Sequence, residues 1–167
     1  MVMLMGLVFC FAVFGLSDLL YARQLTQNSA DDASTDIARD SSGNPHIVYE
    51  RGGNIYYLFR SGGAWSAEEL IGEGTGPAIA VDSTGVPHVV FISGGVAKYT
   101  KRIGGSWQEP VDVSEHTGVN YIDIDVDIGR NAHVVYSTPQ GDGDNYNELF
   151  YVNNFGGTFG IPQMFAD

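Results

Sequence analysis

A polar segment at residues 138–148 carries oxygen donors of the kind that calcium prefers. The candidate ligands are Asp142, Asp144, Asn145 and Glu148. Their spacing differs from that of an EF-hand loop, because Tyr146 stands at the third liganding position. The segment therefore supports two hypotheses, a calcium site and a solvated hairpin loop.

Two tryptophans, Trp65 and Trp107, have flat apolar surfaces on which a sugar ring could stack. The same side chains could instead pack between neighbouring structural units, since a large aromatic side chain buries much area. Phe159 holds the corresponding place later in the chain and keeps the bulk without the polar N–H group, which favours packing. Sugar binding and packing both stay open as roles for the two tryptophans.

Charged residues also lie on two segments with strand-like patterns. Arg39 ends the first segment, and Asp123, Asp125 and Asp127 alternate on the second. Side chains two residues apart on a strand share a face, so the carboxylates predict either a ligand- or cation-binding face or a face turned to water. A carboxylate pair could also act as acid and base on a glycoside, but the sequence does not define their separation. We predict ligand binding at Arg39, Asp123 and Asp125 and assign no catalytic residue.

These candidates belong to a sequence that repeats three times. The copies read Asp-Ser-Ser-Gly-Asn-Pro-His from Asp40, Asp-Ser-Thr-Gly-Val-Pro-His from Asp82 and Asp-Ile-Gly-Arg-Asn-Ala-His from Asp127. The aspartate and the histidine are six residues apart each time, and the copies begin 42 and then 45 residues apart. A tyrosine followed eight residues later by Trp or Phe repeats in the same order. Internal repeats of this length predict stacked structural units.

The repeated histidines, His46, His88 and His133, allow a metal-site or a structural interpretation. Equivalent residues of successive repeats lie one repeat apart, so the three side chains meet at one ion only if they surround a central axis. The alternative is that each histidine begins a strand and bonds to the aspartate of the turn before it. We favour this structural role.

Each repeat has the pattern of four short strands. β-branched and aromatic residues follow each histidine, and Gly-Gly pairs and Asp-rich turns separate the strands. We predict an all-β fold of tandem four-stranded antiparallel blades, three blades of a β-propeller, at about residues 35–73, 76–114 and 120–165. Closed propellers have about four to eight blades. The chain is therefore predicted to be an incomplete propeller, or else to self-associate and close the ring.

The repeats resemble those of the sialidase-like (BNR-type) β-propeller superfamily, in particular its secreted, non-catalytic members. The resemblance rests on the Asp-Ser-x-Gly-x-Pro-His-Val-Val-Phe turn and strand, covers the chain from Thr35 onward and implies a blade architecture. The turn at Ser61–Trp65 lacks the aspartate of the family's Asp-box, Ser-x-Asp-x-Gly-x-x-Trp. Phe59-Arg60 also lacks the Ile-Pro of the Phe-Arg-Ile-Pro motif that carries a catalytic arginine in sialidases. The resemblance thus supports the fold and argues against sialidase activity.

Composition excludes several classes of protein. Eight Lys and Arg against 20 Asp and Glu give a net charge of −12, which excludes the basic stripe that nucleic acid or an anionic membrane surface requires. The one cysteine, Cys10, precedes the repeats, so they hold no disulfide, zinc-cysteine site or cysteine nucleophile.

The N-terminal residues predict export. Met1–Leu16 contains no charged residue, so we predict an apolar helix within residues 1–23 that serves as a signal peptide or membrane anchor. A polar linker follows at 24–34. The expected location is secreted, cell-surface or periplasmic, and any membrane contact would come through this helix alone.

The predicted function is that of an extracellular β-propeller module that binds a carbohydrate or a protein or acts as a surface scaffold. Two alternatives remain, a fragment of a sialidase-like propeller glycoside hydrolase and an anchored subunit of a surface filament. An enzyme is the less favoured class. No cofactor is predicted apart from the calcium hypothesis.

Overall fold

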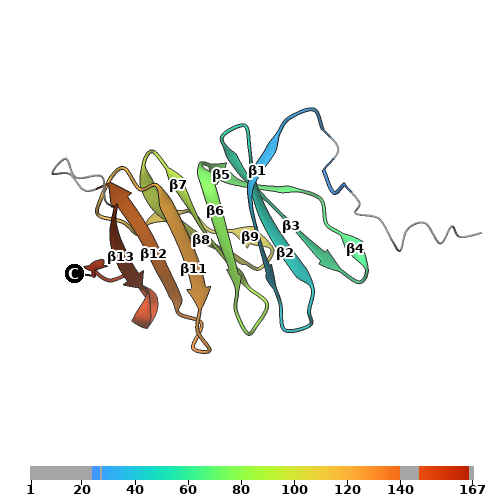
Figure 1. Cartoon of the computed structure of the whole chain (residues 1–167). Helices are drawn as coiled ribbons and strands as arrows, with labels where there is room; N and C mark the ends of the chain where they lie inside the picture. The colour runs from blue at the N-terminus through green and yellow to red at the C-terminus, as the bar shows by residue number, and fades with distance from the viewer. Residues whose placement is uncertain (1–23, 27, 140–146, 166–167) are drawn as a thin grey trace, which may run out of the picture.

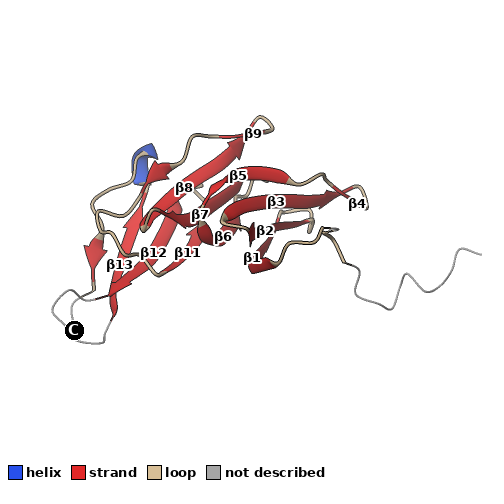
Figure 2. Ribbon diagram, turned by 90° about the horizontal axis from the view of Figure 1, so that it is seen from above, coloured by secondary structure: helices blue, strands red, loops and turns tan. Residues whose placement is uncertain are grey.

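The computed structural model describes residues 24–26, 28–139 and 147–165. These residues form three antiparallel β-sheets that follow one another in chain order across the molecule (Figure 1). The view from above gives the same order (Figure 2). Each sheet contains one sequence repeat, so we call the sheets the first, second and third blades. The prediction of an all-β antiparallel fold is confirmed.

The blades are built from the following strands. The first blade comprises β1 (Asp32–Arg39), β2 (Pro45–Arg51), β3 (Asn54–Ser61), β4 (Ala64–Trp65) and β5 (Glu69–Glu73). The second comprises β6 (Thr75–Val81), β7 (Pro87–Ser93), β8 (Val96–Ile103), β9 (Ser106–Trp107) and β10 (Val111–Asp112). The third comprises β11 (Tyr121–Val126), β12 (Ala132–Pro139), β13 (Asn147–Asn153) and β14 (Gln163–Met164), with a 3-10 turn, η2 (Phe155–Gly157).

The predicted N-terminal helix requires a correction. The described residues contain no α-helix, and none of their elements is a helix long and apolar enough to span a membrane. Residues 1–23, where the helix was expected, lie outside the described residues, and β1 begins at Asp32, inside the predicted linker. Hydropathy alone supported that helix, and an apolar run without a polar face gives a helix no particular side to pack against a sheet. The fold class is all-β.

The predicted fourth strand is also corrected, because it divides into two pieces. Trp65 and Trp107 lie in the two-residue strands β4 and β9, which pair with the ends of β3 and β8. The edge strands β5 and β10 come a few residues later. Between the pieces the Ser66 hydroxyl bonds to backbone groups, and Pro110 has no N–H to donate, so the ladder is interrupted. The first two blades therefore have five strands and the third has four.

The turn after the first strand is built as the sequence predicts. The Asp40 carboxylate accepts the backbone N–H groups of Ser42 and Asn44 at 2.9 and 2.8 Å. Gly43 takes a positive φ of 82° there, which is open to glycine at little cost. In the third blade the same place is held by Arg130 at φ 65°. This non-glycine residue therefore sits in a strained backbone region.

The hydrophobic core lies between the blades. One cluster joins the first and second blades and includes Val48, Tyr57 and Phe91. The other joins the second and third blades and includes Val90, Tyr99 and Val134. We call these contacts the first and second junctions. The inner strands β1, β6 and β11 lie side by side, and the view from above places them along one edge of the molecule (Figure 2).

Candidate functional site: the groove between the second and third blades

Each blade holds an Asp–His–Tyr network that supports the junctions. In the first blade, His46 Nδ1 lies 2.6 Å from the Tyr57 hydroxyl and its Nε2 lies 3.8 Å from Asp40. The equivalents are His88 with Tyr99 at 2.6 Å and Asp82 at 3.6 Å, and His133 with Tyr151 at 2.7 Å and Asp127 at 3.3 Å. Each histidine lies near the start of its strand and faces the aspartate of the preceding turn, as predicted, but its Nε2 makes no hydrogen bond to that carboxylate. The hydrogen-bond partner is the tyrosine landmark, which sequence reasoning missed.

The electrostatics of these networks suit a structural role. Burial lowers the pKa of His46 and His88, so both rings are neutral near pH 7. Burial opposes ionisation of Asp82, but hydrogen bonds from Thr84 and Val86 outweigh it and lower its pKa. The ring Nε2 faces the carboxylate at 3.8 Å in the first blade and 3.6 Å in the second, and Nδ1 lies 2.6 Å from the tyrosine hydroxyl in both. The network thereby fixes the tyrosine ring for packing.

The first junction is closed by side chains from both blades. The Trp107 ring meets the Tyr57 ring edge-on, with centroids 5.1 Å apart at 81°. Its Nε1 donates to Glu69 at 3.1 Å, and Arg102 donates two bonds of 2.8 Å to the same carboxylate. Arg102 also lies over the Phe59 ring. Aromatic packing and a bidentate ion pair thus fill this junction.

The second junction lacks that polar set. Val111 pairs with Tyr99 as Glu69 pairs with Tyr57, so Val111 holds the place of Glu69. Asn154 comes three residues after the tyrosine of its blade, as Arg102 does, so Asn154 holds the place of Arg102. Phe159 replaces the tryptophan and packs edge-on against Tyr99, with centroids 4.8 Å apart at 68°. Three coordinated replacements therefore remove the tryptophan, the carboxylate and the guanidinium together. The space left over is a groove of about 390 Å³.

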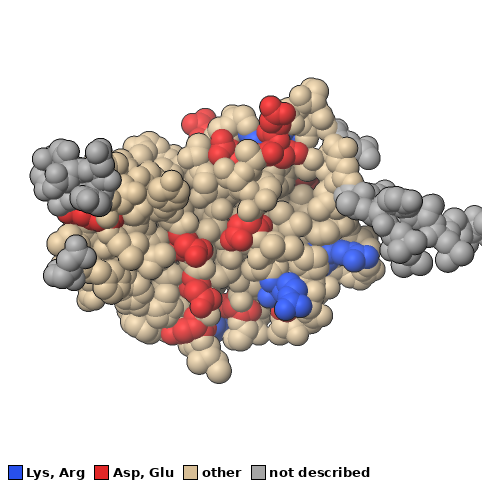
Figure 3. All heavy atoms as spheres, in the orientation of Figure 1, with Lys and Arg blue, Asp and Glu red and all other residues tan. Residues whose placement is uncertain are grey.

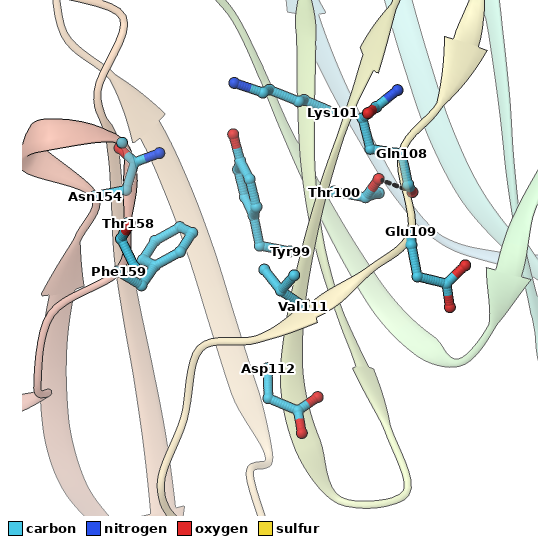
Figure 4. A pocket seen from close by; sticks show the side chains of 11 residues that line it. Tyr99, Thr100, Lys101, Gln108, Glu109, Val111, Asp112, Asn154, Thr158 and Phe159 are labelled. Atoms are coloured by element: carbon cyan, nitrogen blue, oxygen red, sulfur yellow. Dashed lines mark hydrogen bonds between the residues drawn. The ribbon is translucent and has the colours of Figure 1, made fainter.

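The groove combines an apolar floor with polar walls. Tyr99 and Phe159 point toward one another from opposite blades, and Val111 lies beside them (Figure 4). The polar lining consists of Thr100, Lys101, Gln108, Glu109, Asp112, Asn154 and Thr158. Asn154 is held in place because its Oδ1 accepts the Ala132 N–H at 2.6 Å. The groove offers aromatic surface, a cation and carboxamides, whereas the Glu109 and Asp112 carboxylates point away from Tyr99 and Phe159 (Figure 4).

A second hollow continues on the side of the turns. It also measures about 390 Å³ and shares Lys101 and Asn154 with the groove. Its other polar residues include Asp82, Arg130 and Asn131. The two hollows together give the second junction an extended polar surface, with Lys101 and Asn154 where they meet.

The ligand-binding residues proposed from sequence lie away from this groove. Trp65 is on the outward face of the first blade, and Trp107 is inside the first junction. Arg39 lies on β1 of the first blade, whereas Asp123 and Asp125 lie on β11 of the third. The structure thus brings the two aspartates together on one strand and separates them from Arg39.

The predicted calcium ligands fall largely outside the described part of the chain. Asp142, Asp144 and Asn145 are among residues 140–146, which are not described, and Glu148 is an exposed residue of β13. Within the described ranges no group of three or more His, Cys, Asp or Glu residues is placed to hold a metal ion. Calcium binding stays an untested prediction.

Sequence reasoning missed the groove, although a signal was present. The third repeat departs from the second at the positions of Arg102 and Trp107, and the second departs from the first at Glu69. Taken singly, each change is unremarkable. Only the junction geometry shows that the three positions meet.

Comparison with known proteins identifies the fold. No family model and no curated protein matches the sequence. Among solved structures, a Hadza microbial sialidase matches with a TM-score of 0.60 and 10% identity, over 79% of this chain and 37% of its own. A fucose lectin from Kordia zhangzhouensis matches with 0.52 and 15%, over 80% and 98%. An α-L-arabinofuranosidase from Podospora anserina matches with 0.52 and 12%, over 86% and 53%.

These matches show which fold the chain has. The chain is built of β-propeller blades whose architecture is similar to that of these sialidase, lectin and arabinofuranosidase structures. It spans less than half of the sialidase and about half of the arabinofuranosidase, but nearly the whole of the lectin chain. At these identities the likeness concerns architecture, which carries lectins and hydrolases alike.

Proposed function

We propose that this chain is a carbohydrate-binding β-propeller module that takes its ligand in the groove between the second and third blades. The carrying observation is the replacement of Glu69, Arg102 and Trp107 by Val111, Asn154 and Phe159, which opens one junction while its sequence equivalent is filled. A fucose lectin of nearly the same span supports a sugar as the ligand class.

The lining residues suit a sugar because a sugar ring has an apolar face and a polar rim. Phe159, packed on the buried Tyr99 ring, supplies aromatic surface for the apolar face. Lys101 and the Gln108 amide supply donors for the hydroxyl groups, and the Gln108 carbonyl oxygen supplies an acceptor. Concave sites with apolar floors and a few convergent polar groups are the common form of small-molecule sites.

A glycan array with the full chain tests this proposal. We expect binding to a restricted set of glycans, and we expect Lys101→Ala to weaken it at least tenfold, since a hydrogen bond to a charged group contributes about 1.5–3 kcal/mol. The matched control is Arg60→Ala, which removes a cation from β3 outside the groove and leaves binding unchanged. Absence of glycan binding, or equal loss in both variants, would refute the groove as the site.

A glycoside hydrolase is the second candidate function. Glu109 and Asp112 both line the groove, and paired carboxylates carry out glycoside hydrolysis in most families. Asp112 accepts a hydrogen bond from the Lys98 ammonium group. Turnover of fluorogenic glycosides by the full chain, abolished by Glu109→Gln, would support hydrolysis, whereas glycan binding without turnover supports the lectin-like module.

Export to the cell surface or beyond is part of the same proposal. It rests on the uncharged apolar run of Met1–Leu16. Fractionation of cells that produce the full chain tests it, and recovery in the cytoplasm alone would contradict it.

A further inference from the structure

The outward face of the first blade has the residues of a junction surface. Ile37 is 60% exposed, whereas its equivalent in the second blade, Ile79, is 5% exposed because it packs in the first junction. A groove of about 390 Å³ beside it is lined by Ile37, Ile47 and Leu58, with Leu25 from the preceding segment also lining it. Ile47 and Leu58 lie at the places of Val89 and Thr100 of the second blade. Ile37 is therefore the exposed apolar residue of this face, whereas Leu58 is already buried within the chain, at 3% exposure.

The outward face of the third blade corresponds to the other side of a junction, the side with which a blade contacts the blade that follows it. Leu149 is 47% exposed, whereas Ala97 at the same position of the second blade is fully buried in the second junction. Val135, at the position of the buried Val90, is exposed beside it, and both line a shallow hollow. This face repeats the surface with which the first and second blades receive their successors.

The two outward faces carry the two kinds of residue that form the aromatic contact in the inner junctions. In each junction an aromatic residue of the later blade packs edge-on against a tyrosine of the earlier one. Tyr151 keeps the histidine bond that orients such a tyrosine, and it lies on the third blade. Trp65, at the position of Trp107, is 37% exposed on the first blade. Together they would form a third contact of this kind.

Charge at the inner strands distinguishes these faces from the inner junctions. Ala80 and Val126 pack in the second junction, on the two sides of the contact between β6 and β11. On the outward faces, Asp125 of the third blade holds the position of Ala80, and Arg39 of the first blade holds the position of Val126. Acidic side chains gather over the middle and the third-blade side of this edge, and basic ones on the first-blade side (Figure 3). The two faces are thus oppositely charged where the inner junctions are apolar.

We propose that two copies of this chain associate head to tail, with the outward face of the third blade of each copy packed on the outward face of the first blade of the other. Trp65 then meets Tyr151 of the second copy, and Arg39 meets Asp125. Such a contact is heterologous, and with two copies it closes on itself by two-fold rotation. The described blades of two copies together number six, which lies within the range of about four to eight blades of a closed propeller.

Charge reversal and mixing test this association with the full chain. By sedimentation velocity we expect a particle of twice the 18.0 kDa chain mass. Arg39→Glu alone and Asp125→Arg alone each place like charges at both contacts, so we expect the mass to fall by half. An equimolar mixture of these two variants has one native and one reversed ion pair, and we expect the dimer to return.

The control is Glu73→Arg, which reverses an exposed charge on β5 outside both faces and leaves the dimer intact. Monomeric wild-type chain, a particle of three or more copies, or single variants that stay dimeric would each overturn the proposal. Failure of the mixed variants to re-form a dimer would overturn the Arg39–Asp125 contact. Glycan binding is measured separately at the groove, so loss of the dimer with binding retained leaves the proposed function standing.

Discussion

The two junctions of this molecule have the same architecture and different contents. Each places a tyrosine, oriented by a buried histidine, against an aromatic residue of the next blade. The first junction adds the Glu69–Arg102 pair and the indole N–H of Trp107. The second has a groove at the same place. The difference shows that a repeated scaffold can open a site by losing a set of contacts at one junction while the other keeps the blades together.

The largest effect is expected from removing the aromatic residue of the closed junction. Trp107→Ala should lower the free energy of unfolding by about 3 kcal/mol, because it leaves a cavity beside Tyr57 and deletes a bond to Glu69. Phe159→Ala should cost about half as much, since Phe159 already borders open space. Urea denaturation of both variants measures the comparison, and equal losses would contradict the distinction between a filled and an open junction.

Acidification should weaken both junctions. The pKa of His46 and of His88 is lowered by burial, so below the unfolded value near 6.5 the unfolded chain takes up protons that the folded chain refuses. The stabilisation is complete above that pH and is lost as the pH falls, by up to about 1.4 kcal/mol per pH unit for each histidine. Urea denaturation between pH 7.5 and 5 should show this slope, and His88→Gln should reduce it. A slope that the variant leaves unchanged would exclude the histidine as its source.

Rebuilding the polar set in the second junction should close the groove. Val111→Glu combined with Phe159→Trp restores the carboxylate and the indole of the first junction. We expect glycan binding to fall at least tenfold, which corresponds to about 1.4 kcal/mol, with little change in stability. The matched reverse pair, Glu69→Val with Trp107→Phe, should leave glycan binding intact and destabilise the chain. Retention of full binding by the rebuilt variant would place the ligand elsewhere.

The smallest effect concerns the turn beside the groove. Arg130→Gly should stabilise the chain by about 0.5–1 kcal/mol, because Arg130 holds a left-handed conformation at φ 65°. Gly85→Ala is the control in the second blade, where the same conformation is already held by glycine, and it should destabilise by a similar amount. Thermal unfolding measures both, and a lower melting temperature for Arg130→Gly would show that contacts of the arginine outweigh the strain.

The repeat architecture could be predicted because it rests on local chemistry. Asp40 and Gly43 form a turn from their own backbone bonds, and the alternating residues after His46 suit a strand in any surroundings. The structural role of the histidines followed from their fixed distance to the aspartates. The division of the fourth strand could not be predicted, because it depends on how Ser66 and Pro110 meet a neighbouring strand.

The sequence by itself determined three antiparallel β repeats of the propeller-blade kind, a strongly acidic chain and the Asp–His element of each blade. Only the tertiary structure decided that Trp107 fills a junction, that Trp65 faces outward, and that Arg39 is remote from Asp125 within one chain. It alone shows the groove, because Val111, Asn154 and Phe159 are far apart in sequence and meet only when two blades pack. Turns and strands depend on neighbours along the chain, whereas sites between blades depend on contacts that no single repeat contains.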